Sequence, residues 1–145
     1  MTREELLVIT ERYLDAWRRH DPVAIAQYHA PNAVAESPIY ATLRGRKAIE
    51  DAARAFISSF PDATFAVDHL LIDAPRVVMF TTVNATHANE FFGMPGTNRR
   101  IEFRNAWLLE FDGGGLIAYE RRIYDFTGLL LQIGVLRAKP AKPLA

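Results

Sequence analysis

The carboxylate of Asp125 is the first candidate for chemistry in this sequence. It stands between Tyr124 and Phe126, at the end of the last strand-like segment and immediately before an apolar turn. A carboxylate in such apolar surroundings is desolvated, and desolvation raises its pKa toward the range in which an acid–base catalyst works. The alternative is that Asp125 caps the following turn, residues 126–133, through a side-chain oxygen.

His87 and Asn105 are two further polar side chains that could act in a pocket. His87 follows a strand-like run and opens a long connection, so it sits where cavity mouths form, and an imidazole suits proton transfer. A partly exposed loop histidine is the alternative. Asn105 is a lone polar residue on the apolar face of its strand. Because an unpaired buried amide costs roughly 1–3 kcal/mol, we expect it to have a side-chain, water or ligand partner.

Charge is dense in residues 119–124, where Glu120, Arg121 and Arg122 place charged groups on both faces of one strand. One explanation is that one face is solvated or lies at a subunit contact. The other is that Glu120 or Arg122 points into a cavity and polarises a substrate oxygen, for which the fork of donors on an arginine is well suited.

The remaining residue patterns exclude several kinds of site. The four histidines, at positions 20, 29, 69 and 87, lack the i, i+4 spacing of a helical metal pair, so we expect no metal. Glycines 113–115 lie between two strand-like runs, which makes them a turn and not a phosphate cradle. The absence of a Gly-x-Ser-x-Gly elbow argues against an activated serine.

Three helices are predicted in the first 60 residues. The first covers about residues 2–19 and begins with a capping box. An Asp-Pro pair at 21–22 starts a second, short helix that ends near 31–32. A brief hairpin, residues 33–43, precedes a third helix that follows a glycine and runs to about residue 60.

After residue 61 the apolar period changes from 3.6 to 2, which predicts strands. The four candidates are residues 64–72, 76–86, 100–111 and 116–125. An apolar turn over residues 126–136 and a frayed tail from about 137 end the chain. Helices followed by an antiparallel meander predict one α+β domain over residues 1–145, with a curved antiparallel sheet wrapped around its own helices.

Several motifs of this chain resemble the NTF2-like α+β cone fold. Its opening is matched by Tyr13, Asp21, residues 33–38 (AVAESP) and residues 44–46 (RGR). Within that fold, four stretches resemble the SnoaL-like polyketide cyclase branch: residues 87–95, 100–103, 124–125 and 128–134. The resemblance covers about residues 4–136. It implies a cone with a pocket between the sheet and the three N-terminal helices, and a homodimer with sheets back to back.

The resemblance also implies roles for particular residues. The cyclase branch places its acid–base aspartate at Asp125. Ketosteroid isomerase-like relatives have a general base near Glu36, although Ser37 holds the matching position here. Tyr13 matches their tyrosine on the first helix, whereas Trp107 stands where a protonated acid would complete their oxyanion hole. Two of the three catalytic positions therefore depart from that constellation.

These observations predict a cofactor-free enzyme that moves a proton next to a carbonyl of a hydrophobic, polyketide-like or terpenoid-like substrate, in a cyclisation or isomerisation. The catalytic candidates are Asp125, His87 and Glu36, with His87 or Asn105 stabilising the enolate. The alternatives are hydrolysis or dehydration in the same pocket, and a non-catalytic small-ligand-binding module. The expected substrate-binding residues are Tyr13, Trp17, Tyr40, Phe56, Phe91, Asn105, Trp107 and Arg122.

Composition limits the partners. The 17 basic and 17 acidic residues cancel, which argues against nucleic acid, and the lack of cysteine excludes disulfides and thiol nucleophiles. No apolar run approaches the roughly 18 residues of a membrane span, and the first residues predict a polar helix and not a signal peptide. We expect a cytoplasmic homodimer that binds a small hydrophobic carbonyl compound, with no membrane partner.

The connection over residues 88–99 is expected to be a mobile lid over the cavity mouth. It combines Phe91, Phe92 and Met94, which are costly to leave in water, with residues that resist regular structure. The alternative is a static connection packed on the dimer partner.

Overall fold

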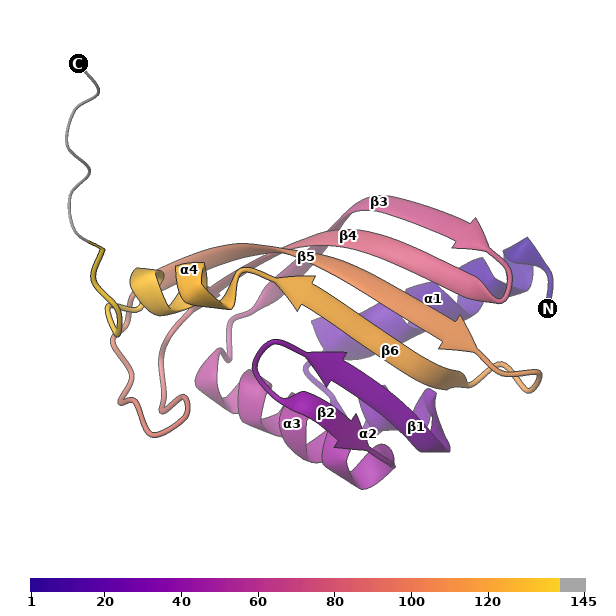
Figure 1. Ribbon diagram of the computed structural model, residues 1–145, viewed down its shortest axis with the longest axis horizontal. Coiled ribbons are helices and arrows are strands. Elements are labelled where there is room, and N and C mark those ends of the chain that lie inside the picture. Colours follow the sequence, from indigo (N-terminus) through magenta and orange to yellow (C-terminus); the bar gives the residue numbers. More distant parts are fainter. Residues whose placement is uncertain (139–145) are drawn as a thin grey trace, which may run out of the picture.

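The computed structural model describes residues 1–138, which form one six-stranded sheet and four helices (Figure 1). The helices are α1 (Arg3–Arg18), α2 (Pro22–Gln27), α3 (Arg46–Ser59) and α4 (Phe126–Gln132). The strands are β1 (His29–Ser37), β2 (Ala41–Arg44), β3 (Thr64–Asp73), β4 (Arg76–Thr86), β5 (Arg100–Phe111) and β6 (Ile117–Tyr124). The expected frayed tail falls mostly on residues 139–145, which lie outside the described residues.

The predicted helix starts are confirmed. At α1, the Glu5 N–H donates to Thr2 Oγ1 at 3.1 Å and the Thr2 N–H donates to the Glu5 carboxylate at 2.8 Å, which completes the capping box. The end predicted for the second helix is wrong, because α2 stops at Gln27 and β1 begins at His29. Pro31 explains the difference, since a proline lacks the N–H that a continuing helix needs and keeps its predecessor extended.

The strand order of the sheet is β2-β1-β6-β5-β4-β3. Every neighbouring pair is antiparallel except β1 and β6, which run parallel, so the sheet is mixed and not wholly antiparallel as expected. No hairpin joins β1 to β6, since α3 and four other strands separate them in the chain, and a long crossover permits either direction. This pairing brings the start of β1 next to the charged strand β6.

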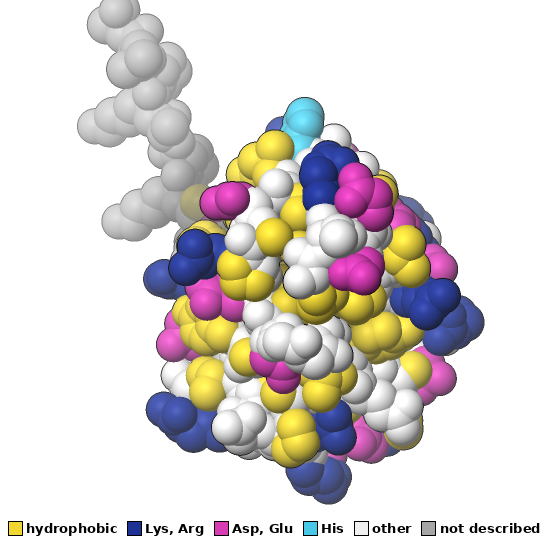
Figure 2. All heavy atoms as spheres, turned by 90° about the vertical axis from the view of Figure 1, so that its right-hand side faces the viewer, with side chains coloured by type: hydrophobic (Ala, Val, Ile, Leu, Met, Phe, Trp, Pro, Cys, Tyr) yellow, Lys and Arg dark blue, Asp and Glu magenta, His cyan; other side chains and the backbone are white. Residues whose placement is uncertain are grey.

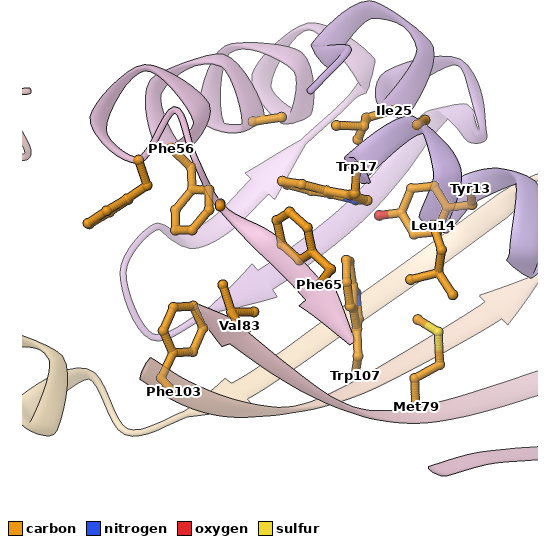
Figure 3. Close-up of a cluster of buried hydrophobic side chains, with 14 of the residues drawn as sticks. Tyr13, Leu14, Trp17, Ile25, Phe56, Phe65, Met79, Val83, Phe103 and Trp107 are labelled. Carbon is orange, nitrogen blue, oxygen red and sulfur yellow. The ribbon is translucent and has the colours of Figure 1, made fainter. Parts of the chain in front are cut away.

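The sheet curves around the helices and leaves one face inside the molecule (Figure 1). Register shifts in β1, β3 and at the end of β5 add to the bend, because each extra residue twists its strand locally. Aromatic side chains from α1 and α3 meet those of the strands inside the curve (Figure 3). The core there includes Trp17, Phe56, Phe65, Val83, Phe103 and Trp107. The α+β class is thus confirmed.

The connection over residues 88–99 is tied to the end of α3. The N–H groups of Ala88 and Asn89 donate to the carbonyl of Ser59 at 3.1 and 3.3 Å, and Ser59 Oγ donates to the carbonyl of Glu90 at 2.5 Å. Its middle is open, since Phe92 is 57% exposed. The start of the connection is therefore anchored within its own chain, while the motion expected of the lid stays a prediction.

Basic and acidic side chains are interspersed on the face shown in Figure 2, with no region of one sign. Among the described residues, no helix is long and apolar enough to span a membrane.

Candidate functional site

A fully buried carboxylate, Glu120 of β6, lies at the centre of the molecule. Its Oε2 accepts hydrogen bonds from Tyr13 Oη at 3.1 Å and faces His29 Nε2 at 2.5 Å. Its Oε1 accepts from Trp107 Nε1 and from Arg122 Nε, each at 2.5 Å. Two partners on each oxygen satisfy the acceptor capacity of the carboxylate, so Glu120 has no lone pair left for a substrate.

The surroundings of Glu120 keep it ionised. Burial by itself would raise the pKa of this carboxyl, but the charge of Arg122 and the hydrogen bond from His29 outweigh burial and lower the pKa to about 2. Burial by itself would lower the pKa of Arg122, but the charge of Glu120 outweighs burial and raises this pKa. Burial raises the pKa of Tyr13 well above its usual value of 10. The cluster therefore holds a permanent carboxylate facing a permanent guanidinium.

Arg122 connects this cluster to a cavity. Its guanidinium carbon lies 4.8 Å from the ring centroid of Trp17 and 4.5 Å from that of Trp107, so both indoles contribute cation–π attraction. Only Nε donates to a carboxylate in the described residues, and 20% of the side chain stays exposed. Glu120 and the two indoles thus fix the guanidinium while its other nitrogens remain accessible.

The inner cavity has a volume of about 30 Å³, room for one or two water molecules. Arg122 is the only charged group on its wall within the described residues, and Tyr40, Tyr124 and Asn105 add polar groups. Burial raises the pKa of Tyr124 to about 12 and also raises that of Tyr40, so both stay hydroxyl donors. Its other lining residues are Trp17, Ala52, Phe56, Phe65, Val83, Phe103 and Trp107.

Asn105 lies on the cavity wall with its Oδ1 buried and without a hydrogen-bond partner in the described residues. Thr81, directly opposite it on β4, likewise has a buried Oγ1 without a partner. The side-chain partner considered from the sequence is therefore missing among residues 1–138. Since buried polar groups are almost always paired, the Asn105 Oδ1 favours a water or a ligand atom in the cavity that donates to it.

Two further hollows adjoin the cavity through Tyr40. One is a narrow space of about 10 Å³ whose wall includes Glu36 and Arg122. The other, of about 340 Å³, lies outside and is bounded by α3 and residues 90–92. The Tyr40 ring stacks on Phe92 with centroids 5.4 Å apart. Tyr40 and Phe92 thus stand between the outer hollow and the interior.

Glu36 is half-buried on β1. It accepts a hydrogen bond from Tyr119 Oη at 2.7 Å and lies 4.0 Å from Arg121 Nε. These partners lie on the outer face of β6, opposite to Glu120 and Arg122, so the Glu36 carboxylate points away from the cavity although the residue borders the narrow space beside Arg122.

Asp125 differs from its expected surroundings. It is exposed, it caps α4 by accepting from the Gly128 N–H at 2.8 Å, and it lines none of the hollows described above. The expectation of a desolvated carboxylate is wrong, because the helix start draws the side chain to its own backbone.

His87 is fully buried beside the ring of Phe60. Its Nδ1 lies 3.0 Å from Thr97 Oγ1, and its Nε2 has no partner in the described residues. Burial lowers its pKa, which favours the neutral imidazole. It lines neither the cavity nor the adjoining hollows, so the structure separates it from Arg122.

Six of the eight expected substrate-binding residues line the inner cavity. Phe91 lines the outer hollow, and Tyr13 lies behind the cavity wall with its hydroxyl on Glu120. The sequence reasoning missed His29, which it treated as one scattered histidine. The available signal was the alternation of Glu120, Arg122 and Tyr124, which places all three on one face of β6. Nothing local to His29 indicated its partner, because the two are 91 residues apart.

Among residues 1–138, no three histidine or carboxylate side chains come together in a way that could hold a metal ion. The chemistry available to the site is that of a fixed cation, an amide and tyrosine hydroxyls in an apolar cavity.

Comparison with known proteins identifies the family. The SnoaL-like polyketide cyclase family matches residues 7–133, and the chain belongs to this family. Membership supports a small-molecule enzyme-type role. No curated protein sequence matches the chain.

Several solved structures share the fold. AclR from Streptomyces galilaeus, described as a candidate hydroxylase, is 24% identical with a TM-score of 0.82, over 94% of this chain and all of that one. A candidate SnoaL-like polyketide cyclase from Jannaschia sp. CCS1 is 12% identical with a TM-score of 0.83, over 92% and 94%. A protein of ketosteroid isomerase-like fold from Catenulispora acidiphila is 19% identical with a TM-score of 0.72, over 87% and 92%. At these identities the likeness shows the fold alone.

Proposed function

We propose that this protein is a cofactor-free enzyme that removes and returns a proton next to a carbonyl of a hydrophobic substrate, and so catalyses an isomerisation or a cyclisation. The observation that carries the proposal is the position of Arg122, a fixed guanidinium in an otherwise apolar cavity. An enolate oxygen develops negative charge in such a reaction, and a preorganised cation stabilises it more strongly in a dry site than in water.

The residues divide the work as follows. Arg122 holds the substrate oxygen, and the Nδ2–H group of Asn105 on the cavity wall donates a second hydrogen bond to it. A general base takes the proton and returns it as general acid, or the enolate carbon attacks a second carbonyl in a cyclisation. Glu36, which borders the narrow space beside Arg122, can be this base only if its carboxylate leaves Tyr119 and Arg121 for that space. Glu120 touches no substrate in this scheme and acts only by fixing Arg122.

Substrate entry needs a rearrangement, because the inner cavity is smaller than the roughly 300–1,000 Å³ of ordinary ligand pockets. Tyr40 separates it from the outer hollow of 340 Å³. We propose that Tyr40 and Phe92 swing aside to join the two spaces.

The test uses 2-indanone, an aromatic ketone whose exchange of α-protons in D₂O is followed by NMR. We expect the protein to accelerate exchange, Arg122→Met to lose about 100-fold or more, and Glu36→Gln a similar factor. Arg104→Met, a matched change on the outer face of β5, should leave the rate unchanged. Exchange no faster than in buffer would reject the enzymatic proposal.

A non-catalytic ligand-binding module is the second candidate. The observation that favours it is the small volume of the inner cavity, together with the complete hydrogen bonding of Glu120. Under this alternative, ligands bind at Arg122 while the α-protons of 2-indanone exchange only at the rate found in buffer.

We also propose that two copies pair through the outer face of the sheet. Phe80, Ala106 and Ile123 lie opposite one another in register on β4, β5 and β6, and Phe80 and Ile123 are 44% and 57% exposed. Leu71 of β3 lies on the same face, in register with Val78 of β4 and Leu108 of β5, and is 61% exposed. Covering this apolar face is the physical reason for a dimer.

A further inference from the structure

His29 has an acceptor at each ring nitrogen. Its Nδ1 lies 3.1 Å from the carbonyl oxygen of Ile25, and its Nε2 lies 2.5 Å from Glu120 Oε2. A neutral imidazole carries one N–H and can satisfy only one of these acceptors, whereas the imidazolium carries two. His29 is fully buried, so no water can donate the second hydrogen bond in place of the missing N–H. The geometry therefore matches the charged form.

The other way to satisfy both contacts is a protonated Glu120 that donates to a neutral His29. This arrangement conflicts with the other groups on the carboxylate, because Tyr13, Trp107 and Arg122 all donate to it. A protonated carboxyl would also leave Arg122 without a counterion. The low pKa of Glu120 agrees with the ionised carboxylate.

The charges around His29 then do not cancel. Arg122 and His29 are two cations, and Glu120 is the one carboxylate within ion-pair distance of either among residues 1–138. From α3, Arg46 donates its Nε–H to the backbone carbonyl of His29 at 2.6 Å and adds positive charge on the other side. From α1, only the uncharged ring of Tyr13 packs on the imidazole, 5.5 Å away.

We propose that the ligand of the inner cavity carries an anionic group, a carboxylate or an acidic enol or phenol, which neutralises the excess charge shared by His29, Glu120 and Arg122. This proposal rests on the proposed function in two respects: the ligand binds in the inner cavity, and Arg122 contacts it. The wall offers such an anion the free nitrogens of Arg122, the hydroxyl of Tyr124 and the Nδ2–H group of Asn105, and it presents no carboxylate. The Tyr40 hydroxyl already donates to the carbonyl of Ala52 at 3.4 Å. His29 is a positioning residue here, since it acts through Glu120 and touches no ligand.

The first measurement is the charge of His29 in the unmodified protein. A ¹⁵N spectrum of the imidazole rings at pH 7 should show two protonated, nearly equivalent nitrogens for His29. The signal is assigned by its loss in His29→Gln, or by elimination with variants of His20, His69 and His87. A ring with one unprotonated nitrogen would overturn the inference.

The second measurement compares benzoate with benzamide, which have the same shape and differ in charge. Calorimetry should show benzoate binding at least about tenfold more tightly to the wild type, with most of that ratio lost in His29→Gln. Tyr13→Phe removes a hydrogen bond from the same carboxylate oxygen without changing charge, and should keep the ratio. Equal affinities, or no binding of either probe, would overturn the proposal.

The results separate this inference from the proposed function. A preference for benzoate without exchange of 2-indanone protons supports the anionic ligand and rejects the enzyme. Proton exchange without a preference for benzoate rejects only the anionic ligand.

Discussion

Glu120 stabilises the fold only while it is ionised, which gives a prediction about pH. Its folded pKa of about 2 lies below its usual 4.5, so its contribution is complete above pH 4.5 and is lost as the pH falls toward 2. The difference corresponds to roughly 3 kcal/mol. Glu120→Gln should lower the free energy of unfolding by about 3–5 kcal/mol at pH 7, since Arg122 and His29 lose their counterion.

Urea unfolding of the wild type and of Glu120→Gln at several pH values tests this prediction. The gap between the two proteins should narrow between pH 4.5 and 2. A gap as large at pH 2 as at pH 7 would show that the buried carboxylate does not act through its charge.

Asn105 offers the opposite test, because its buried Oδ1 has no partner in the described residues. Replacing it by leucine, of similar size, removes a buried amide without a protein partner, so Asn105→Leu should melt at the same or a higher temperature than the wild type. Proton exchange of 2-indanone should fall at least about tenfold, because the second donor to the oxygen is gone. A clear loss of stability would instead indicate a bound structural water.

The start of α4 depends on one short contact between a side chain and the backbone. Asp125→Ala should lower stability by about 0.5–2 kcal/mol through the lost cap, with activity per folded molecule unchanged. Asp125→Asn should keep the cap and also the activity. If Asp125→Asn folds normally but loses proton exchange, the catalytic role expected from the sequence is restored.

Gly128 gives a matched check on the same cap. A Cβ there would lie 2.3 Å from Asp125 Oδ2, so Gly128→Ala must displace the capping carboxylate. Gly113→Ala, where a Cβ meets nothing within 4 Å, is the control. The effects of Gly128→Ala and Asp125→Ala should not add, because both remove one interaction.

Two parts of the connection over residues 88–99 should differ in their rates of hydrogen exchange. Ala88 and Asn89 donate to Ser59 and should exchange slowly, whereas Gly96 and Thr97, whose N–H groups have no backbone partner in the structure, should exchange rapidly. Slowing of the rapid part by benzoate would support a lid. Protection of Gly96 and Thr97 equal to that of β5 in the free protein would contradict it.

The outer face of the sheet leads to a prediction about the whole molecule. Light scattering at micromolar concentration should give twice the 16.4 kDa chain mass. Ile123→Lys should produce monomers, because it buries a charge at the proposed contact. Val8→Lys, a similar change at an exposed apolar residue of α1, should leave the dimer intact. A wild-type mass of one chain would reject the proposed pairing.

The sequence by itself determined most of the elements and their class. Periodicity placed β3 to β6 within one or two residues, and the capping box and the Asp-Pro pair located two helix starts, because such signals act over a few neighbouring residues. The predicted end of α2 failed because a proline and a strand partner 88 residues away overrode the local pattern at His29. The capping role of Asp125, left open as an alternative, is likewise a local interaction.

Only the tertiary structure decided the site. Alternation could place Glu120 and Arg122 on one face of β6, but which face lies inside depends on how the sheet curves over α1. The parallel pairing of β1 with β6 brings His29 onto Glu120, and the antiparallel pairing of β5 brings Trp107 to its other oxygen. The residues in these contacts are separated in the sequence by between 13 and 107 positions. A charged side chain becomes part of a defined site only when the fold excludes water around it.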